Sequence, residues 1–486
     1  MHPASYFIGI DVGTQGARVA LMDAAGHLLG SREKSFPLQE KTREEQSPGG
    51  WWSACLDCLQ SLLHESPLQA CLPFIRAIAV TSTSGTVIPV DHRHRPLHNA
   101  IMYSDGRQVN AAVTCREAAV RYNPNGYTSF NTSSGLPKML WFAQNFSGEM
   151  ENLYKFIHAA DFITGQLCGR FDITDWTNAL KSGYDVRQRT WPAYIWQQLK
   201  IQREWLPEVV PSGTPLGKIR PELAARLGLP PEVEIVAGMT DGCASQIAAG
   251  AVNPGDWNTT IGTTLVIKGV TTKEISDPNG VLYCHRHPEG FWMPGGASNT
   301  GADWVTKRFP GDLAMLDQQA MPIIPTPHLS WPLLQPGERF PFKAPQARGF
   351  EPEGLSAVES FAAGMEGVAY IERYAYEMIR QLSGEAVKMV YTAGGASNSH
   401  TWLTIRSNVL NLPIVKMKHV TGATGAAILA ASKTAFTNIM EAAAAMTQVA
   451  EKVLPSPAMA AAYDSHYRNF IQLLKEKGYL SSYEHT

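Results

Sequence analysis

The 486-residue chain lacks an excess of charge, a set of paired cysteines and any long apolar run. Lys and Arg number 41 against 43 Asp and Glu, so the basic excess that is typical of nucleic-acid-binding proteins is missing. Seven Cys, an odd number in so long a chain, do not make a disulfide framework and favour a reducing compartment. No stretch of about 18 apolar residues could cross a bilayer. We therefore expect a cytoplasmic protein that binds neither nucleic acid nor membrane.

Three short motifs are similar to known binding sites but are incomplete. Cys55 and Cys58 form a single CxxC pair, and no second pair or nearby His completes four zinc ligands, so we expect both thiols in the core. His285 and His287 would face the same side of a strand, again without a third ligand. The segment 213–218 is similar to a P-loop, but it has three residues between its glycines and no following Ser or Thr. We expect a simple turn there.

The composition, 44% apolar and 17% charged, is that of a globular protein with room for two to four domains. β-like runs at Phe7 to Asp11, Ala17 to Asp23 and Leu28 to Ser31 predict a three-stranded meander. A helical pattern from Trp52 to Leu63 and a β-branched run from Ile75 to Thr81 follow. This order indicates an α/β layer.

The second half begins in a similar way, because Asn258 to Ile267 again forms two β-like runs broken at a Gly-Thr turn. Pro322 to Pro345 holds seven prolines in 24 residues, which predicts an irregular surface excursion. A long helix from Ala357 to Leu382 comes next, and Gly422 to Ser432 is the last helix that we expect. We place the boundary near residue 247, which gives domains 1–247 and 248–486 with a cleft between them.

A carboxylate at the end of the first strand is followed by a Gly/Thr turn. Gly13 lets backbone N–H groups converge on an anion, and Thr14 and Gln15 add side-chain donors. Asp11 at the edge of this turn could hold Mg²⁺ through water, since Mg²⁺ prefers few carboxylates and several waters beside phosphates. An ordinary hairpin turn with an Asp cap remains the alternative for this motif alone.

Two further glycine turns strengthen the phosphate-binding interpretation. Gly262 and Thr263 repeat the first turn, and Gly394 and Gly395 stand between a strand and a helix, where backbone can approach a flat base or ribose. Three separated turns of this kind can close on one nucleotide. They favour a nucleotide site over three unrelated turns.

A second carboxylate, Asp241, follows the strand Glu234 to Ala237 and opens a helix of small residues. A carboxylate in this place could accept a hydroxyl proton while a phosphoryl group is transferred. It could instead be a helix N-cap, because Asp is among the preferred capping residues. The sequence pattern leaves both roles open.

Together these residues resemble the FGGY carbohydrate kinases, within the superfamily of actin, Hsp70 and sugar kinases, over nearly the whole chain. The motifs that carry the resemblance stand in the family's order: Ile10 to Thr14, Pro137 to Trp141, Gly238 to Gly242, Gly262 to Thr264, Gly337 to Arg339 with Arg348-Gly349, Gly394 to Asn398, and Gly425 to Ala427.

The resemblance implies an α/β fold with two ribonuclease-H-like domains flanking an ATP cleft. Domain 1–247 would bind the sugar and end with the catalytic Asp, and domain 248–486 would bind the nucleotide. Asp241 would be the general base and Asp11 the catalytic carboxylate on the metal side, with ATP and Mg²⁺ as cofactors. The nucleotide would be bound by Gly13, Thr14, Gln15, Gly262, Thr263, Gly301, Gly394, Gly395, Ala396 and Asn398.

One departure from the family bears on the sugar. Xylulose kinases carry Gln-Met-His-Gly after the strand near residue 80, whereas this chain reads Ser82 to Thr86, which is more similar to the D-ribulose kinase branch. We therefore expect a ketopentose, D-ribulose ahead of D-xylulose, contacted by Ser84, Asp105 and Asp241. Glycerol, L-ribulose and pentitols remain alternative substrates. A non-kinase, ATP-driven binding or chaperone module remains an alternative of another class, and a homodimer is left open.

Overall fold

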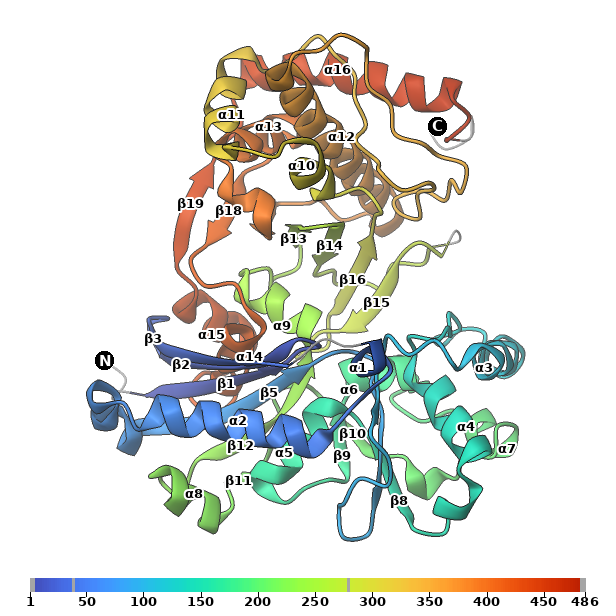
Figure 1. Cartoon of the computed structure of the whole chain (residues 1–486), viewed down its shortest axis with the longest axis vertical. Helices are drawn as coiled ribbons and strands as arrows, with labels where there is room; N and C mark the ends of the chain where they lie inside the picture. Colours follow the sequence, from blue (N-terminus) through green and yellow to red (C-terminus); the bar gives the residue numbers. More distant parts are fainter. Residues whose placement is uncertain (1–4, 37–39, 278–279, 481–486) are drawn as a thin grey trace. The chain divides into compact units, whose positions relative to one another are not determined.

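A computed structural model describes residues 5–36, 40–277 and 280–480. The chain divides into two compact units (Figure 1). Unit 1 contains the described residues up to 248 together with 285–290 and 419–447, and unit 2 contains the other described residues. The assignment of sugar binding to residues 1–247 and of nucleotide binding to residues 248–486 stays a prediction.

Unit 1 is built on a six-stranded sheet in which the predicted meander is confirmed. The first three strands are antiparallel, the next two run parallel to the first, and the edge strand is antiparallel. In sheet order the strands are β3 (Leu28–Ser35), β2 (Gly16–Asp23), β1 (Tyr6–Val12), β5 (Ile75–Ser82), β12 (Glu234–Thr240) and β11 (Pro215–Lys218).

Side chains alternate between the two faces of β1, and helices cover both faces. Ile8 and Ile10 belong to the core beneath α2 (Pro48–Leu63) and α5 (Ala159–Cys168). Gly9 points the other way, towards α14 (Gly422–Ala431), where a Cβ would lie 1.8 Å from the carbonyl oxygen of Ala423. The absence of a side chain at Gly9 lets α14 lie directly on the sheet.

A second core of unit 1 lies between α3 (Val109–Tyr122), α4 (Gly135–Asn145) and β8 (Leu153–Ile157). Cys55 and Cys58 are buried, as predicted, and Gly213 lies in a turn before β11 with φ +83°. The helices and short strands are α1 (Glu40–Glu44), β4 (Glu45–Gln46), β6 (Ile88–Asp91), β7 (Ala100–Ile101), α3 (Val109–Tyr122), α4 (Gly135–Asn145), β8 (Leu153–Ile157), β9 (Ile173–Asp175), α6 (Trp176–Ala179), α7 (Tyr194–Gln197), β10 (Glu208–Val210), α8 (Pro221–Leu227), α9 (Asp241–Ala248), α14 (Gly422–Ala431) and α15 (Ile439–Met446).

The sheet of unit 2 repeats the strand order of unit 1. A hairpin of two strands is flanked by a parallel strand on one side and an antiparallel strand on the other. In sheet order the strands are β15 (Tyr283–Arg286), β16 (Trp292–Ala297), β14 (Leu265–Gly269), β13 (Asp256–Ile261), β17 (Met389–Ala393), β18 (Ile414–Met417) and β19 (Val449–Val453).

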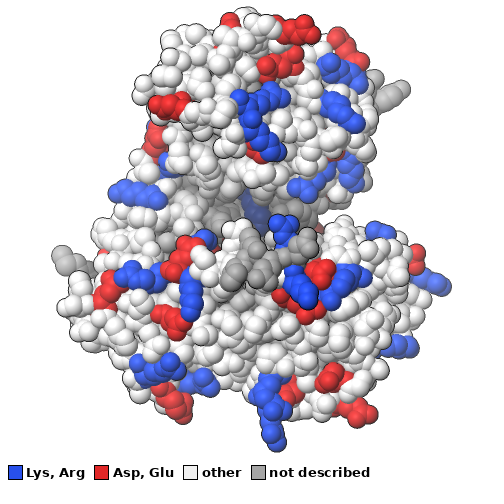
Figure 2. All heavy atoms as spheres, viewed as in Figure 1, with Lys and Arg blue, Asp and Glu red and all other residues white. Residues whose placement is uncertain are grey.

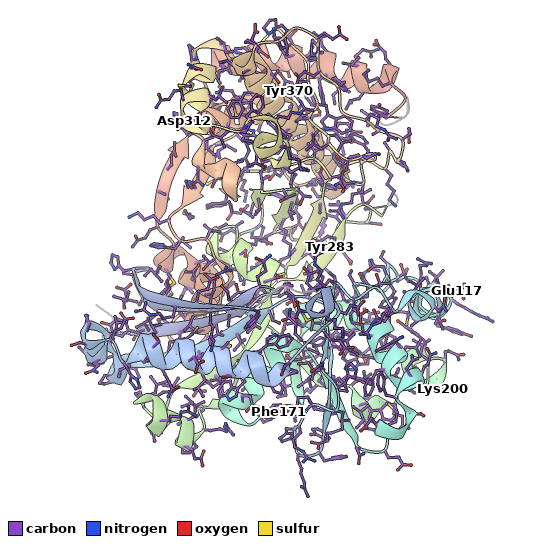
Figure 3. The ribbon with its side chains drawn as sticks, in the orientation of Figure 1. Glu117, Phe171, Lys200, Tyr283, Asp312 and Tyr370 are labelled. Atoms are coloured by element: carbon purple, nitrogen blue, oxygen red, sulfur yellow. The ribbon has the colours of Figure 1, made fainter. Side chains whose placement is uncertain are left out.

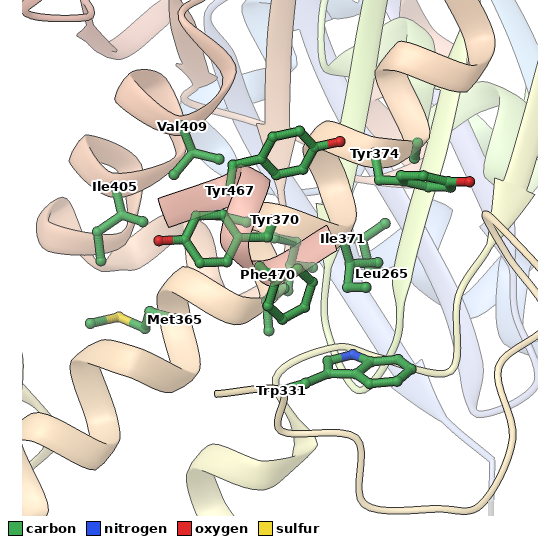
Figure 4. Packing of buried hydrophobic residues seen from close by; sticks show 14 of the residues in the cluster. Leu265, Trp331, Met365, Tyr370, Ile371, Tyr374, Ile405, Val409, Tyr467 and Phe470 are labelled. Carbon is green, nitrogen blue, oxygen red and sulfur yellow. The ribbon is translucent and has the colours of Figure 1, made fainter. Parts of the chain in front are cut away.

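Tyr370, on the long helix of unit 2, lies at the centre of this unit's core (Figures 3 and 4). Its ring packs at a tilt against those of Tyr467 and Phe470 of the last helix, with ring centroids 6.2 and 5.1 Å away. The helices are α10 (Asp303–Arg308), α11 (Leu313–Ala320), α12 (Ala357–Ser383), α13 (His400–Leu410) and α16 (Pro457–Glu476). The prediction that Gly422 to Ser432 is the last helix is wrong, because α15 and α16 follow it.

The proline-rich excursion is irregular, as predicted, but its placement on the surface is wrong. Trp331 is 0% exposed and Phe340 is 1% exposed, and both belong to the core of unit 2. Apolar residues between the prolines anchor the segment, because burying them is favourable even without regular secondary structure.

Charged side chains of both signs are interspersed over the face drawn in Figure 2, which agrees with the balanced composition. Among the described residues, no helix combines the length and apolarity needed to cross a membrane.

Candidate active site

The two predicted carboxylates lie at the same edge of the unit 1 sheet. Strands β1 and β12 flank β5 and run parallel to it, so all three end at one edge. In register, Asp11 lies opposite Thr81, and Thr81 lies opposite Met239, two residues before Asp241. Two strand spacings separate the Cα atoms of Asp11 and Met239 by roughly 10 Å.

The carboxyl group of Asp11 lies in surroundings that disfavour its ionised form. It is 7% exposed, and its Oδ1 atom is buried with no hydrogen-bond partner. Burial, followed by repulsion from the Asp241 carboxylate, raises the pKa of Asp11 to about 7, while Arg18 acts in the opposite direction. The first residue of α14, Gly422, adjoins it so closely that a Cβ there would lie 2.6 Å from Oδ2. The N-terminus of this helix favours the ionised form of Asp11.

These features fit the predicted magnesium site. An unpartnered buried oxygen on a carboxyl that resists ionisation is an atom that a cation would satisfy. Within the described residues, no three His, Cys, Asp or Glu side chains gather as metal ligands. Mg²⁺ does not need such a cage, since it binds through one or two carboxylates, waters and phosphate oxygens. Asp11 is the residue that would hold it.

The first glycine turn lines a hollow of about 410 Å³ with Arg18, Arg43, Tyr103 and Ser104. The turn is closed by a hydrogen bond from Gly13 N to Gly16 O of 3.0 Å, and Gln15 belongs to the same lining. Thr14 Oγ1 donates to Tyr103 Oη at 3.4 Å. Tyr103 was not among the predicted site residues, because no sequence spacing relates it to Thr14.

Ser84 lies at the same sheet edge, two residues beyond the end of β5, and its Oγ is buried without a partner. Gly85, with φ +83°, turns the chain there so tightly that a Cβ would lie 2.2 Å from the carbonyl oxygen of Ser133. The free hydroxyl is available for a hydrogen bond with a ligand. This agrees with the predicted sugar contact of Ser84, which stays a prediction.

Asp105 has a different environment, since it is 0% exposed and its two oxygens accept from Arg107. The hydrogen bonds from Arg107 outweigh burial and lower the pKa of Asp105, although burial is the largest single effect. A sugar contact of Asp105 would require Arg107 to release an oxygen. Arg107 itself stacks on Trp141, 4.7 Å from the ring centroid.

In unit 2 the structure brings together three glycine segments that are far apart in sequence. A Cβ on Gly301 would lie 2.3 Å from the carbonyl oxygen of Thr263, and one on Gly394 would lie 2.4 Å from that of Ile261. Ala302 N also donates to Gly262 O at 2.7 Å. The turn at Gly262 and Thr263 therefore packs against both other segments, and only glycine permits these approaches.

The third segment continues as a short 3₁₀ helix, Gly395–Asn398. Gly394 adopts φ +86°, and a Cβ on Gly395 would meet open space. Ala396 is 4% exposed, and Asn398 Oδ1 accepts from Lys416 Nζ at 2.8 Å. These placements are compatible with the predicted nucleotide contacts, which stay predictions.

Glu338 of the proline-rich excursion holds the Ser298–Gly301 segment in place, a role that the sequence analysis missed. Its Oε2 accepts from Ser298 Oγ at 2.7 Å and from Thr300 Oγ1 at 2.8 Å, and its Oε1 accepts from Asn299 N at 2.7 Å. Gly337 and Glu338 are part of a family motif in the sequence. The signal for this role was a charged residue in an apolar, proline-rich stretch, since such a residue needs hydrogen-bond partners when it is buried.

Comparison with known proteins decides the family. The model for the "FGGY family of carbohydrate kinases, N-terminal domain" matches residues 6–248, and that for the C-terminal domain matches residues 257–434. The chain belongs to the FGGY family of carbohydrate kinases. It is 27% identical over 443 residues to a xylulose kinase of Bacillus subtilis, covering 88% of each chain.

Two other relatives have a similar sequence identity to this chain. A gluconokinase of Bacillus subtilis is 24% identical over 442 residues, covering 85% of this chain and 84% of its own. The crystal structure of a xylulose kinase from Rhodospirillum rubrum has a TM-score of 0.82 at 25% identity, covering 97% of this chain and 98% of its own.

These findings confirm the two-domain α/β sugar-kinase fold and the enzyme class. The protein is a phosphotransferase that acts on an alcohol group of a small-molecule sugar, and kinases of this family use ATP. The alternative of a non-kinase binding or chaperone module is thereby excluded.

His285 and His287 are both buried, and neither belongs to a group of metal-ligating side chains in the described residues.

Proposed function

We propose that the protein is a ketopentose kinase that phosphorylates the terminal hydroxyl of D-ribulose in preference to D-xylulose, with ATP and Mg²⁺, in the cytoplasm. The observation that carries the proposal is the common sheet edge of unit 1, where Asp11 and Asp241 lie with the unpartnered Ser84 hydroxyl. A proton acceptor, a carboxylate suited to a cation and a free hydroxyl for a polyol are the groups that sugar phosphorylation needs.

Asp241 acts as general base. Its carboxylate accepts the proton of the sugar's terminal hydroxyl as that oxygen bonds to the γ-phosphorus of ATP, and the bond from this phosphorus to the bridging oxygen of ADP breaks. Gly242 N donates to Asp241 Oδ1 at 2.6 Å, which holds the carboxylate at the start of α9. Bound Mg²⁺ supplies positive charge to the phosphate oxygens.

The glycine segments of unit 2 support nucleotide binding. Gly394 and Gly395 are exposed and Gly262 is half-buried, and a Cβ on Gly262 or Gly395 would meet open space, whereas Gly301 is buried against the Thr263 carbonyl. Backbone N–H groups in such turns bind phosphate or approach a base closely. Asp11 would hold Mg²⁺, through water, beside the phosphates.

The choice of sugar rests on the Ser82 to Thr86 segment. Thr83 Oγ1 and Thr86 Oγ1 hydrogen-bond each other at 2.9 Å, and Ser82 Oγ accepts from Ala160 N at 2.9 Å, so Ser84 is the member of the segment that is left for the sugar. A site built to hydrogen-bond a hydroxyl discriminates strongly against a substrate that lacks it or presents it elsewhere.

A kinase assay with purified protein, ATP and Mg²⁺ across D-ribulose, D-xylulose, L-ribulose, glycerol, pentitols and gluconate tests the proposal. We expect kcat/KM to be highest for D-ribulose and next for D-xylulose. A maximum on glycerol, a pentitol or gluconate would overturn the ketopentose assignment. The Ser84→Ala variant serves as a specificity probe, and its KM for the sugar should rise while its KM for ATP stays unchanged.

A further inference from the structure

The Met239–Thr240 peptide unit, one residue before Asp241, has both of its polar groups held by threonine hydroxyls. Thr81 Oγ1 donates to Met239 O at 2.8 Å, and Thr240 N donates to Thr177 Oγ1 at 2.9 Å. Thr81 and Thr177 are both 0% exposed. Because Met239 O and Thr240 N belong to the same peptide, β5 holds one end of its plane and α6 holds the other.

Thr177 is in turn anchored by Asp175, the N-cap of α6. Asp175 Oδ1 accepts from Thr177 Oγ1 at 2.6 Å, from Thr177 N at 2.7 Å and from Ser212 Oγ at 3.0 Å, and Oδ2 accepts from Asn178 Nδ2 at 2.5 Å. Asp175 is 1% exposed. Since the Thr177 hydroxyl gives its hydrogen to this carboxylate, its oxygen lone pairs are directed to the Thr240 N–H.

Strand β12 needs this support because it ends irregularly. Val236 lies opposite Ala79, whereas Met239 lies opposite Thr81, so β12 takes up one extra residue. Gly238 makes this possible, since a Cβ there would lie 1.8 Å from the carbonyl oxygen of Val80. A bulge interrupts the ladder and re-aims the residues that follow it. Strand β12 pairs with β5 again at Met239 and Thr240, and the two threonine hydroxyls add contacts outside the ladder that help to set the direction in which Asp241 leaves the strand.

We propose that Asp175, acting through Thr177, aims the Asp241 carboxylate at the acceptor hydroxyl, so that both are positioning residues of the kinase reaction. This rests on the proposed role of Asp241 as base. Neither side chain is accessible to a substrate, and their effect passes through the Met239–Thr240 peptide. A misplacement of about 1 Å costs roughly 10²-fold in rate, so the loss should appear in kcat and leave KM nearly unchanged.

Three variants test the proposal. Thr177→Val keeps the shape but removes the acceptor of the Thr240 N–H, and Thr177→Ser keeps the hydroxyl. The matched control is Thr164→Val, because Thr164 is 3% exposed in α5 and its hydroxyl has no partner. We expect Thr177→Val to lower kcat by about 10- to 100-fold with both KM values within about threefold, and Thr177→Ser to stay within about threefold of wild type.

Hydrogen–deuterium exchange of peptides covering residues 236–244 adds a readout that needs no turnover. Exchange should quicken in Thr177→Val and stay at the wild-type rate in Thr177→Ser and Thr164→Val. Wild-type kcat in Thr177→Val, or an equal loss of kcat in Thr164→Val, would overturn the proposal. Unchanged exchange in Thr177→Val would also overturn the proposal, and this readout does not depend on any kinase activity. If the wild-type enzyme phosphorylated none of the sugars, that result would refute the proposed function instead.

Discussion

The two units share one sheet plan but carry different side chains at corresponding places. In each, a hairpin with a Gly-Thr turn, β1–β2 or β13–β14, is followed in the sheet by a parallel strand, a second parallel strand and an antiparallel edge strand. Aligning Gly13-Thr14 with Gly262-Thr263 places Asp11 of unit 1 opposite Thr260 of unit 2. At this place unit 1 thus has a carboxylate where unit 2 has a neutral hydroxyl.

Under the proposed function, this difference assigns the chemistry to unit 1. Beyond the first parallel strand, β5 in unit 1 leads to Ser84, and β17 in unit 2 leads to Gly394 and Gly395. Beyond the second parallel strand, β12 in unit 1 is followed by Asp241, and β18 in unit 2 is followed by Lys418. Polar and acidic groups suit proton transfer and a cation, and bare backbone suits a nucleotide. The same backbone plan can therefore support either task, and the side chains at the strand ends decide which.

The largest expected effect is that of Asp241→Asn, which keeps the size of the side chain and removes the base. We expect kcat to fall by about 10²- to 10⁴-fold with the sugar KM little changed. The matched control is Asp256→Asn in unit 2, a buried carboxylate at the start of β13 that accepts from Asn253. Steady-state kinetics of both variants measure this. An equal loss of activity in the two variants would contradict a special role of the unit 1 carboxylate.

Asp11→Asn should mainly affect the metal and ATP. We expect the Mg²⁺ concentration for half-maximal rate to rise by about 10- to 100-fold, as is usual when a group that orients metal-bound water is lost. The KM for the sugar should stay near the wild-type value. A Mg²⁺ titration at saturating ATP and sugar measures this, and a change confined to the sugar KM would reverse the assignment of Asp11.

Gly394→Ala tests the nucleotide side of the comparison. The added methyl would meet the Ile261 carbonyl at 2.4 Å and would sit at φ +86°, so the turn must shift. We expect ADP binding, measured by titration calorimetry, to weaken by about tenfold with the sugar KM unchanged. Gly311→Ala, in open space on unit 2, is the control. Unaltered ADP affinity in Gly394→Ala would count against a nucleotide site there.

The last prediction concerns stability and leaves catalysis aside. Each unit buries a carboxyl whose pKa lies at about 7, Asp11 and Glu366, but Glu366 accepts hydrogen bonds from Thr326 and Tyr463. Because burial raises the folded pKa of Glu366 from 4.5 to about 7, its contribution to stability is full below pH 4.5 and is lost as the pH rises to about 7.

Glu366→Gln removes this titration and can keep the hydrogen bonds, since an amide also offers one acceptor and donors. The unfolding free energy of the variant should exceed that of wild type at pH 8 by up to about 3 kcal/mol, and the gap should close towards pH 4.5. Denaturant unfolding at several pH values measures it. A gap that does not vary with pH would show that Glu366 does not titrate in this range.

Much of the fold could be predicted from the sequence, because its signals were local. The strands around Asp11 and the hairpin at Gly262 follow from β-branched runs broken by glycine. Helix α16 was missed although Tyr463, Tyr467 and Phe470 recur at helical spacing behind a Pro at its start. The excursion was placed on the surface because prolines exclude regular elements but say nothing about burial.

The site was predictable only in part. Asp11 and Asp241 stand at strand ends that sequence patterns reveal, and parallel strands bring their ends together. The pairing of Asp175 and Thr177 with Thr240 depends on a bulge in β12, and the contact of Thr14 with Tyr103 depends on a loop path. Neither has a periodic signal, so only the three-dimensional structure could supply them.

The most direct test of the account is a crystal structure of the wild-type protein with MgADP and D-ribulose. The account predicts the Asp241 carboxylate within about 2.6–3.2 Å of the sugar's terminal hydroxyl and Asp11 joined to Mg²⁺ through water. A terminal hydroxyl paired with another residue, with Asp241 directed away from the sugar, would contradict it.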